Sequence, residues 1–179
     1  MWRSLAVSGA VLVTLDLMYA FVPVWAVEQG ISATTVGFLL AIRALVSVIS
    51  RFGLTRLVSV FGRKPLIICS IAAAVAGLVA LPFSGTWGAV GVMIGLGLGL
   101  GIPQPLTMAW VTSLTPSESH GATLGMRLTA NRLAQISLPL AVGAFAAPLG
   151  VLGIFWANAG LLLAAIGIMA RSAPGEKRP

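Results

Sequence analysis

Apolar and polar positions alternate along this chain on the scale of whole helices. Six apolar stretches follow one another, and short turns rich in glycine, proline or polar residues separate them. A helix of ~20 apolar residues crosses the ~30 Å hydrocarbon core of a bilayer, so each stretch is long enough to span it. The pattern predicts an all-α, polytopic membrane protein with a single six-helix domain over residues 1–179 and spans at about 5–27, 33–58, 66–81, 87–111, 121–145 and 151–170.

Composition excludes a soluble domain. The chain is 58% hydrophobic and 8% charged, with a mean hydropathy of +1.03, and one soluble core could not bury that much apolar surface. The first stretch superficially resembles a secretory signal sequence. We reject that interpretation because the stretch runs on to about Val27 and contains Asp16.

The net charge of +7 indicates orientation rather than a nucleic-acid partner. Basic residues gather at both ends and in the segment 51–64, whereas the predicted outer turns contain Glu28 and no Lys or Arg. The positive-inside rule then places both termini in the cytoplasm, in a multi-pass protein of the plasma or inner membrane. One cysteine, Cys69, and one histidine, His120, offer no metal-ligand cluster, so neither a metal nor a cofactor is expected.

The fifth stretch, 121–145, carries polar side chains where a membrane helix would normally carry Leu. A cation near the bilayer centre costs at least ~2.5–3.5 kcal/mol, so such residues usually face a bundle interior or a water-filled cavity. At ~100° per residue, three of them fall on one stripe with the fourth beside it. The alternative is that the arginines only tie helices together or extend to the membrane surface. The residues are Arg127, Asn131, Gln135 and, beside the stripe, Arg132.

Two further charges, Asp16 and Arg43, lie deep in the first and second stretches. Counted from the ends of their spans, Asp16, Arg132 and Arg43 all lie at a depth of ~15–16 Å. We therefore predict an ion pair between Asp16 and Arg132, with Arg43 competing for the same carboxylate and one arginine left for substrate. The prediction places three arginines and one aspartate within the membrane, and this excess of positive charge weakly favours an anionic solute.

The fourth stretch combines glycines with a helix-breaking pair of prolines. Gly95 and Gly99 stand four residues apart, with Gly91 before them, and this spacing allows close helix packing in membranes. Pro103 and Pro105 remove helix hydrogen bonds on either side of Gln104, which predicts a kinked or locally opened helix. Tight packing alone and a flexible helix lining a transport cavity both fit this pattern.

At the segment FGRKPLI, Phe61–Ile67, the sequence resembles the major facilitator superfamily. The segment is similar to the end of the loop signature between the second and third helices of each half, whose fuller form has Gly, then Asp-Arg, then Gly-Arg-Arg/Lys. Ser59 and Val60 stand at the Asp-Arg positions, so the acidic member of the charge relay attributed to this signature is missing. The matching residues are Gly62, Arg63 and Lys64.

A second segment, PSESHGATLG at Pro116–Gly125, is similar to the family's loop and fifth helix in the carboxy-terminal half, usually written Pro-x-Glu-x-Arg-Gly-x-Ala-x-Gly. Asn131, Pro139 and Gly143 continue the likeness. His120 stands at the usual Arg position, which weakens a cytoplasmic charge contact or makes it pH-dependent. This second likeness, the incomplete loop signature, the Gly-rich fourth stretch and the basic tail together favour the interpretation that the chain is the carboxy-terminal half. Neither motif specifies a substrate.

The resemblance implies alternating access, in which two six-helix halves, each built from inverted three-helix repeats, rock about a site near the midplane. This chain would supply one half, with spans one and four lining the cavity and spans two and five meeting the other half. We expect a fragment of a longer transporter or a truncated gene product, with a dimerising subunit as the other possibility. The expected partners are a small solute, the lipid bilayer, and the missing amino-terminal half or a second copy.

Two other classes of function compete with transport. An intramembrane protease needs a nucleophile paired with a base, but Ser84 lies in an outer turn and His120 in a cytoplasmic loop, so we expect no enzyme. A non-transporting membrane subunit or scaffold is the alternative, because the glycine-rich packing face alone would satisfy it.

Overall fold

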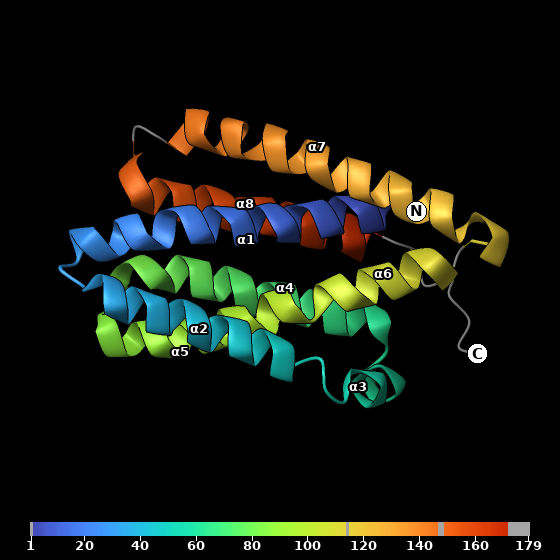
Figure 1. The fold of residues 1–179 in the computed structure, drawn as a ribbon, viewed down its shortest axis with the longest axis horizontal. Helices are drawn as coiled ribbons and strands as arrows, with labels where there is room; N and C mark the ends of the chain where they lie inside the picture. Colours follow the sequence, from blue (N-terminus) through green and yellow to red (C-terminus); the bar gives the residue numbers. More distant parts are fainter. Residues whose placement is uncertain (1, 114, 147–148, 172–179) are drawn as a thin grey trace.

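The computed structural model describes residues 2–113, 115–146 and 149–171, and these residues form long helices that run side by side (Figure 1). A short helix, α3, lies across one end of the bundle. The elements are α1 (Trp2–Glu28), α2 (Ala33–Ile49), α3 (Leu54–Phe61), α4 (Arg63–Ala80), α5 (Thr86–Gly101), α6 (Pro103–Ser113), α7 (His120–Ala146) and α8 (Gly150–Ala170), with 3₁₀ turns η1 (Leu81–Phe83) and η2 (Ser117–Ser119).

Length and composition identify most of these helices as membrane-spanning. Within the described residues, four segments are long and apolar enough, and α2 with α3 qualifies as a fifth only as a bent pair. The 27-residue α7 is long enough as well, but its two arginines and its amides leave it outside this apolar class. The chain is an all-α polytopic membrane protein, as predicted. The four segments are Leu5–Glu28, Arg63–Phe83, Thr86–Ser113 and Gly150–Ala170.

The predicted second span, 33–58, is not one straight helix, and it is interrupted toward its carboxy-terminal end. α2 stops at Ile49, and α3 begins at Leu54 with its axis turned by 65°. Between them Gly53 has φ +77°, a left-handed conformation that glycine adopts without steric cost. The apolar pattern continues through this turn, and hydropathy alone does not register the change of direction.

The interruption predicted in the fourth span is confirmed. α5 ends at Gly101 and α6 begins at Pro103, with Ile102 between them. Proline has no amide hydrogen to donate to the preceding turn, so Pro103 and Pro105 interrupt the hydrogen bonding at this point. Pro139 behaves differently, because α7 continues through it without a break.

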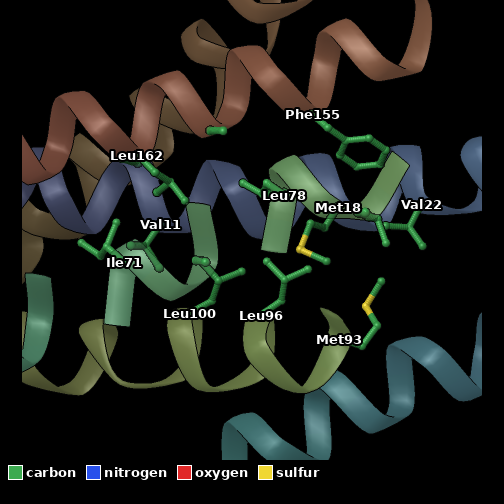
Figure 2. Packing of buried hydrophobic residues seen from close by; sticks show 14 of the residues in the cluster. Val11, Met18, Val22, Ile71, Leu78, Met93, Leu96, Leu100, Phe155 and Leu162 are labelled. Carbon is green, nitrogen blue, oxygen red and sulfur yellow. The ribbon is translucent and has the colours of Figure 1, made fainter. Parts of the chain in front are cut away.

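The core lies among α1, α4, α5 and α8 (Figure 2). Large apolar side chains from the four helices meet there, and most are completely buried. Because lipid tails are as apolar as these side chains, close packing rather than exclusion of water holds the helices together. The labelled members are Val11, Met18 and Val22 of α1, Ile71 and Leu78 of α4, Met93, Leu96 and Leu100 of α5, and Phe155 and Leu162 of α8.

Contacts between helices repeat in the two halves of the chain. α1 packs against α7 and α8, while α5 packs against α2 and α4. If α1 is exchanged with α5, α2 with α7 and α4 with α8, the contacts of α1 become those of α5 and the reverse. Such an exchange is what two three-helix repeats produce.

Glycines of α5 permit the closest helix approaches, but not all those expected. A Cβ on Gly97 would lie 2.7 Å from the carbonyl oxygen of Arg43 in α2, and one on Gly99 would lie 2.7 Å from the backbone of Ser70 and Ala74 in α4. A Cβ on Gly95 would meet no atom within 4 Å in the part of the chain described here. The predicted packing role therefore holds for Gly99 and not for Gly95, which the turn of the helix points away from both neighbours.

Candidate functional site

Arg127 projects from α7 into a buried polar cluster between α1 and α6, where it is 8% exposed. Its Nη2 lies 2.9 Å from Oγ of Ser8 and 3.0 Å from Oγ1 of Thr107. The same nitrogen lies 3.3 Å from the carbonyl oxygen of Gln104, and Nε lies 3.3 Å from Oγ of Ser8. The guanidinium thus ties three helices together, and every acceptor that it contacts is an uncharged oxygen.

Arg43, on α2, is 4% exposed and meets α1 at Tyr19. Its Nη2 donates a hydrogen bond to the Tyr19 hydroxyl, and its Cζ lies 4.9 Å from the centroid of the same ring. That distance is within the range of a cation–π contact. The Nε of Arg43 is buried and has no partner among the described residues. The competition for Asp16 that depth predicted does not occur, because Arg43 is bonded to the tyrosine instead.

Asp16 and Arg132 lie at one level, but the predicted ion pair does not form directly. Gln135 stands between them: its Nε2 donates to Oδ2 of Asp16 at 2.7 Å, and its Oε1 accepts from Nη1 of Arg132 at 2.9 Å. Asp16 and Arg132 are both exposed, and Gln135 is half-buried. An amide bridge separates the two charges because Gln135 lies one helical turn beyond Arg132, on the side of α7 that faces α1.

A hollow of about 450 Å³ opens between α1, α6 and α7. It is within the usual size range of small-molecule sites. Its walls are largely apolar, and none of its lining residues is acidic. Three predicted site residues, Gln104, Arg127 and Asn131, meet at this hollow. Arg51, from the turn after α2, also lines it. The predicted residues Asp16, Arg132 and Gln135 lie outside it. The lining residues are Leu12, Arg51, Gln104, Pro105, Met108, Leu124, Arg127, Leu128 and Asn131.

Two amides beside this hollow have unpaired polar atoms. Nε2 of Gln104 and Oδ1 of Asn131 are buried and lack a hydrogen-bond partner in the described chain. Asn131 is 6% exposed. A buried polar atom without a partner costs roughly 1–3 kcal/mol, so such atoms mark places where a ligand or another surface completes the bonding.

The loop-signature residues lie at the end of the bundle, where α3 meets α4. Gly62 separates the two helices with φ +81°. Nη1 of Arg63 donates to Oγ of Ser113 at the end of α6, at 3.2 Å, and Nζ of Lys64 donates to the carbonyl oxygen of Ala170 at the end of α8, at 3.1 Å. The two basic residues brace the first turn of α4 against the last turns of two other helices.

The model of one protein family, the Major Facilitator Superfamily, matches residues 5–179. A comparison with curated proteins finds no match. The chain belongs to the Major Facilitator Superfamily. Its members are membrane transporters, and membership agrees with the apolar helices and with the paired three-helix contacts.

Membership in the Major Facilitator Superfamily says that the chain is a multi-pass transporter protein and leaves its solute unspecified. Apart from Arg43, which is bonded to Tyr19, the candidate residues on α1, α6 and α7 form two separate groups. Gln104, Arg127 and Asn131 meet at the hollow, whereas Asp16, Arg132 and Gln135 form a separate chain of hydrogen bonds.

Sequence reasoning missed the uncharged partners of the arginines: Ser8, Tyr19 and Thr107. Depth finds all three, since Ser8 lies six residues from the start of α1 and Arg127 seven from the start of α7. Thr107 lies six residues from the end of α6 and Arg127 seven from the start of α7, and Tyr19 and Arg43 lie nine and ten residues from the ends of their helices that meet at the 29–32 turn. The depth prediction covers charged residues alone, whereas the arginines bind hydroxyl groups at the same level.

Proposed function

We propose that this chain forms one six-helix half of a secondary transporter that moves a small solute by alternating access. A second half, either an amino-terminal six-helix domain or a second copy, would face α1 and α7 across the solute pathway. The protein would lie in the plasma or inner membrane with both termini in the cytoplasm. The observation that carries the proposal is the polar face on α1 and α7, which no part of the described chain covers.

Asp16 and Arg132 make up this face at the depth of the membrane centre, and both are exposed. Charged groups there are stable only beside protein or water. Tyr19, 50% exposed, continues the face toward α2. A transporter half needs such a surface, because two halves must separate and close around a wet pathway.

The broken helix supports the same function. Discontinuous helices near the membrane midplane supply unpaired backbone groups and bending points in many transporters. Here the break at Ile102 places Gln104 beside the hollow, one turn from Thr107. Rocking of the two halves would widen or narrow this hollow without unfolding a helix.

The test is solute flux in proteoliposomes that contain the assembled protein. A panel of labelled organic anions, cations and neutral solutes would be screened for saturable uptake, with protein-free vesicles as the control. We expect at least one solute to be carried, and Asp16→Asn to reduce its flux at least tenfold while Arg56→Gln, on exposed α3, leaves it unchanged. Assembled protein that carries no solute in the panel would contradict transport and favour the alternative, a non-transporting membrane subunit.

A further inference from the structure

Arg127 has a positive charge that no residue in the described part of the chain neutralises. Its hydrogen bonds go to hydroxyl and carbonyl oxygens of Ser8, Gln104 and Thr107, and within the described residues it makes no ion pair. Asp16, the carboxylate that lies deepest in a span among the described residues, is bonded to Gln135 instead. A buried guanidinium with only neutral partners keeps most of its desolvation penalty, so an anion beside it would be strongly favoured.

Two residues that line the hollow, Arg127 and Gln104, have donors that are not used within the described chain. Nη1 of Arg127 makes no hydrogen bond among the described residues, although Nη2 and Nε do. Nε2 of Gln104 is a buried donor without a partner in the same part of the chain. The exposed Arg51 contributes a second guanidinium to the wall. Against one unpaired acceptor, Oδ1 of Asn131, the lining offers two cations and an amide donor and contains no acidic residue, so it favours negative charge.

We propose that this hollow binds the anionic group of a small organic solute, with Arg127 and Gln104 as the inner donors and Arg51 at its mouth. The inference deepens the proposed function and rests on it for the claim that the bound anion is the transported solute. Arg127 lies seven residues from the start of α7, about 10 Å along the helix, so the anion would sit about a third of the way through the bilayer. The apolar walls suit a solute whose remaining part is hydrophobic.

The probe is benzoate, and benzamide is its uncharged control of nearly equal shape. Binding of labelled benzoate would be measured on the full chain in nanodiscs of neutral phosphatidylcholine. We expect saturable binding of benzoate and none of benzamide. Benzylamine, which carries the opposite charge, should not compete.

Matched variants then test the assignment. Arg127→Gln should lower benzoate affinity roughly 10- to 100-fold, because it removes hydrogen bonds to a charged ligand, and Arg127→Lys should retain part of it. Arg51→Gln should lower the affinity less, roughly 3- to 10-fold, since this guanidinium is exposed. Arg56→Gln, on α3 outside the hollow, should bind as the wild type does and so reports general charge effects. An unfolding temperature equal to that of the wild type would show that Arg127→Gln is folded. If this variant unfolds at a lower temperature, the benzoate affinities of Arg127→Lys and Arg51→Gln test the proposal in its place.

Three results would overturn the proposal. Wild-type protein that does not bind benzoate saturably would show that the hollow takes no such anion, and an Arg127→Gln variant that binds as well as the wild type would show that Arg127 does not hold it. Nanodiscs that contain phosphatidylglycerol test the other source of negative charge: loss of benzoate binding there by tenfold or more would assign the site to a lipid headgroup instead. The binding assay needs no transport, so its failure and a failure of the flux assay are separate outcomes.

Discussion

Nε2 of Gln135 lies 2.7 Å from Oδ2 of Asp16 and joins α7 to α1 at the middle of the bundle. The same amide accepts from Arg132 at 2.9 Å, so one neutral side chain connects the two charges. Replacing Gln135 by Leu should destabilise the protein by about 1–3 kcal/mol, because both charged groups lose a hydrogen bond. The free energy of unfolding in mixed micelles measures this change.

Coupling between Asp16 and Arg132 should depend on that bridge. In a double-mutant cycle of Asp16→Asn and Arg132→Gln we expect an interaction energy of about 0.5–1.5 kcal/mol. Repeating the cycle in the Gln135→Leu background should bring it close to zero. An interaction energy that is the same in both backgrounds would mean that the charges interact directly, as depth alone predicted. Arg43→Gln, at a residue bonded to Tyr19, serves as the uncoupled control.

Gly99 and Gly95 provide a matched pair of substitutions on one helix. Gly99→Ala would place a Cβ 2.7 Å from backbone atoms of α4 and should cost about 1–3 kcal/mol, because helix backbones cannot shift as easily as side chains. Gly95→Ala meets nothing within 4 Å among the described residues and should be neutral or stabilising by up to about 1 kcal/mol. Thermal unfolding of the two variants would compare them, and equal losses of stability would contradict the packing described for α5.

Tyr19 stabilises Arg43 in two ways that substitution can separate. Tyr19→Phe removes the hydroxyl acceptor and leaves the ring beneath the guanidinium, and it should cost about 1.5–3 kcal/mol. Tyr19→Leu also removes the ring and should cost roughly 0.5–2 kcal/mol more. Unfolding free energies of the two variants measure the difference. If Leu and Phe were equally destabilising, the ring would make no separate contribution.

Orientation can be tested with reporter fusions. Both termini and the 51–64 segment should face the cytoplasm, whereas the turn at Gly30 should face outward. A fusion after Gly30 and one at Gly175, beyond the described residues, should therefore report opposite sides of the membrane. The same side for both would exclude the predicted topology.

Helix positions were predictable from the apolar pattern because a membrane span must have a minimum length. α1, α4 and α8 begin and end within about three residues of the predicted spans, and the interruption at Pro103 follows from the chemistry of proline. The turn at residues 50–53 was not predictable by these means. It depends on a left-handed Gly53, and the residues that follow it are still apolar enough to continue a span.

For the candidate site, depth along each span predicted which residues share a level but not which pairs are formed. Asp16 and Arg132 are level with each other, yet the rotation of α7 places Gln135 between them. Arg51 also lay outside the prediction for the site, because its place at the hollow depends on the bend that follows α2. The number of residues from the end of a span determines the depth of a residue in the membrane, whereas the direction of its side chain depends on how the helices rotate and pack.

The early end of α2 has a consequence for the surrounding lipid. Its 17 residues rise about 25 Å, which is short of the ~30 Å hydrocarbon thickness that neighbouring helices cross. Such a mismatch is accommodated by local thinning of the bilayer or by flanking groups that reach the interface. Here α3 turns aside at 65°, with Phe52 and Phe61 exposed on either side of Arg56. We therefore expect the bilayer to be thinner beside this corner, on the side of α3, and the protein to be sensitive to membrane thickness at this one edge.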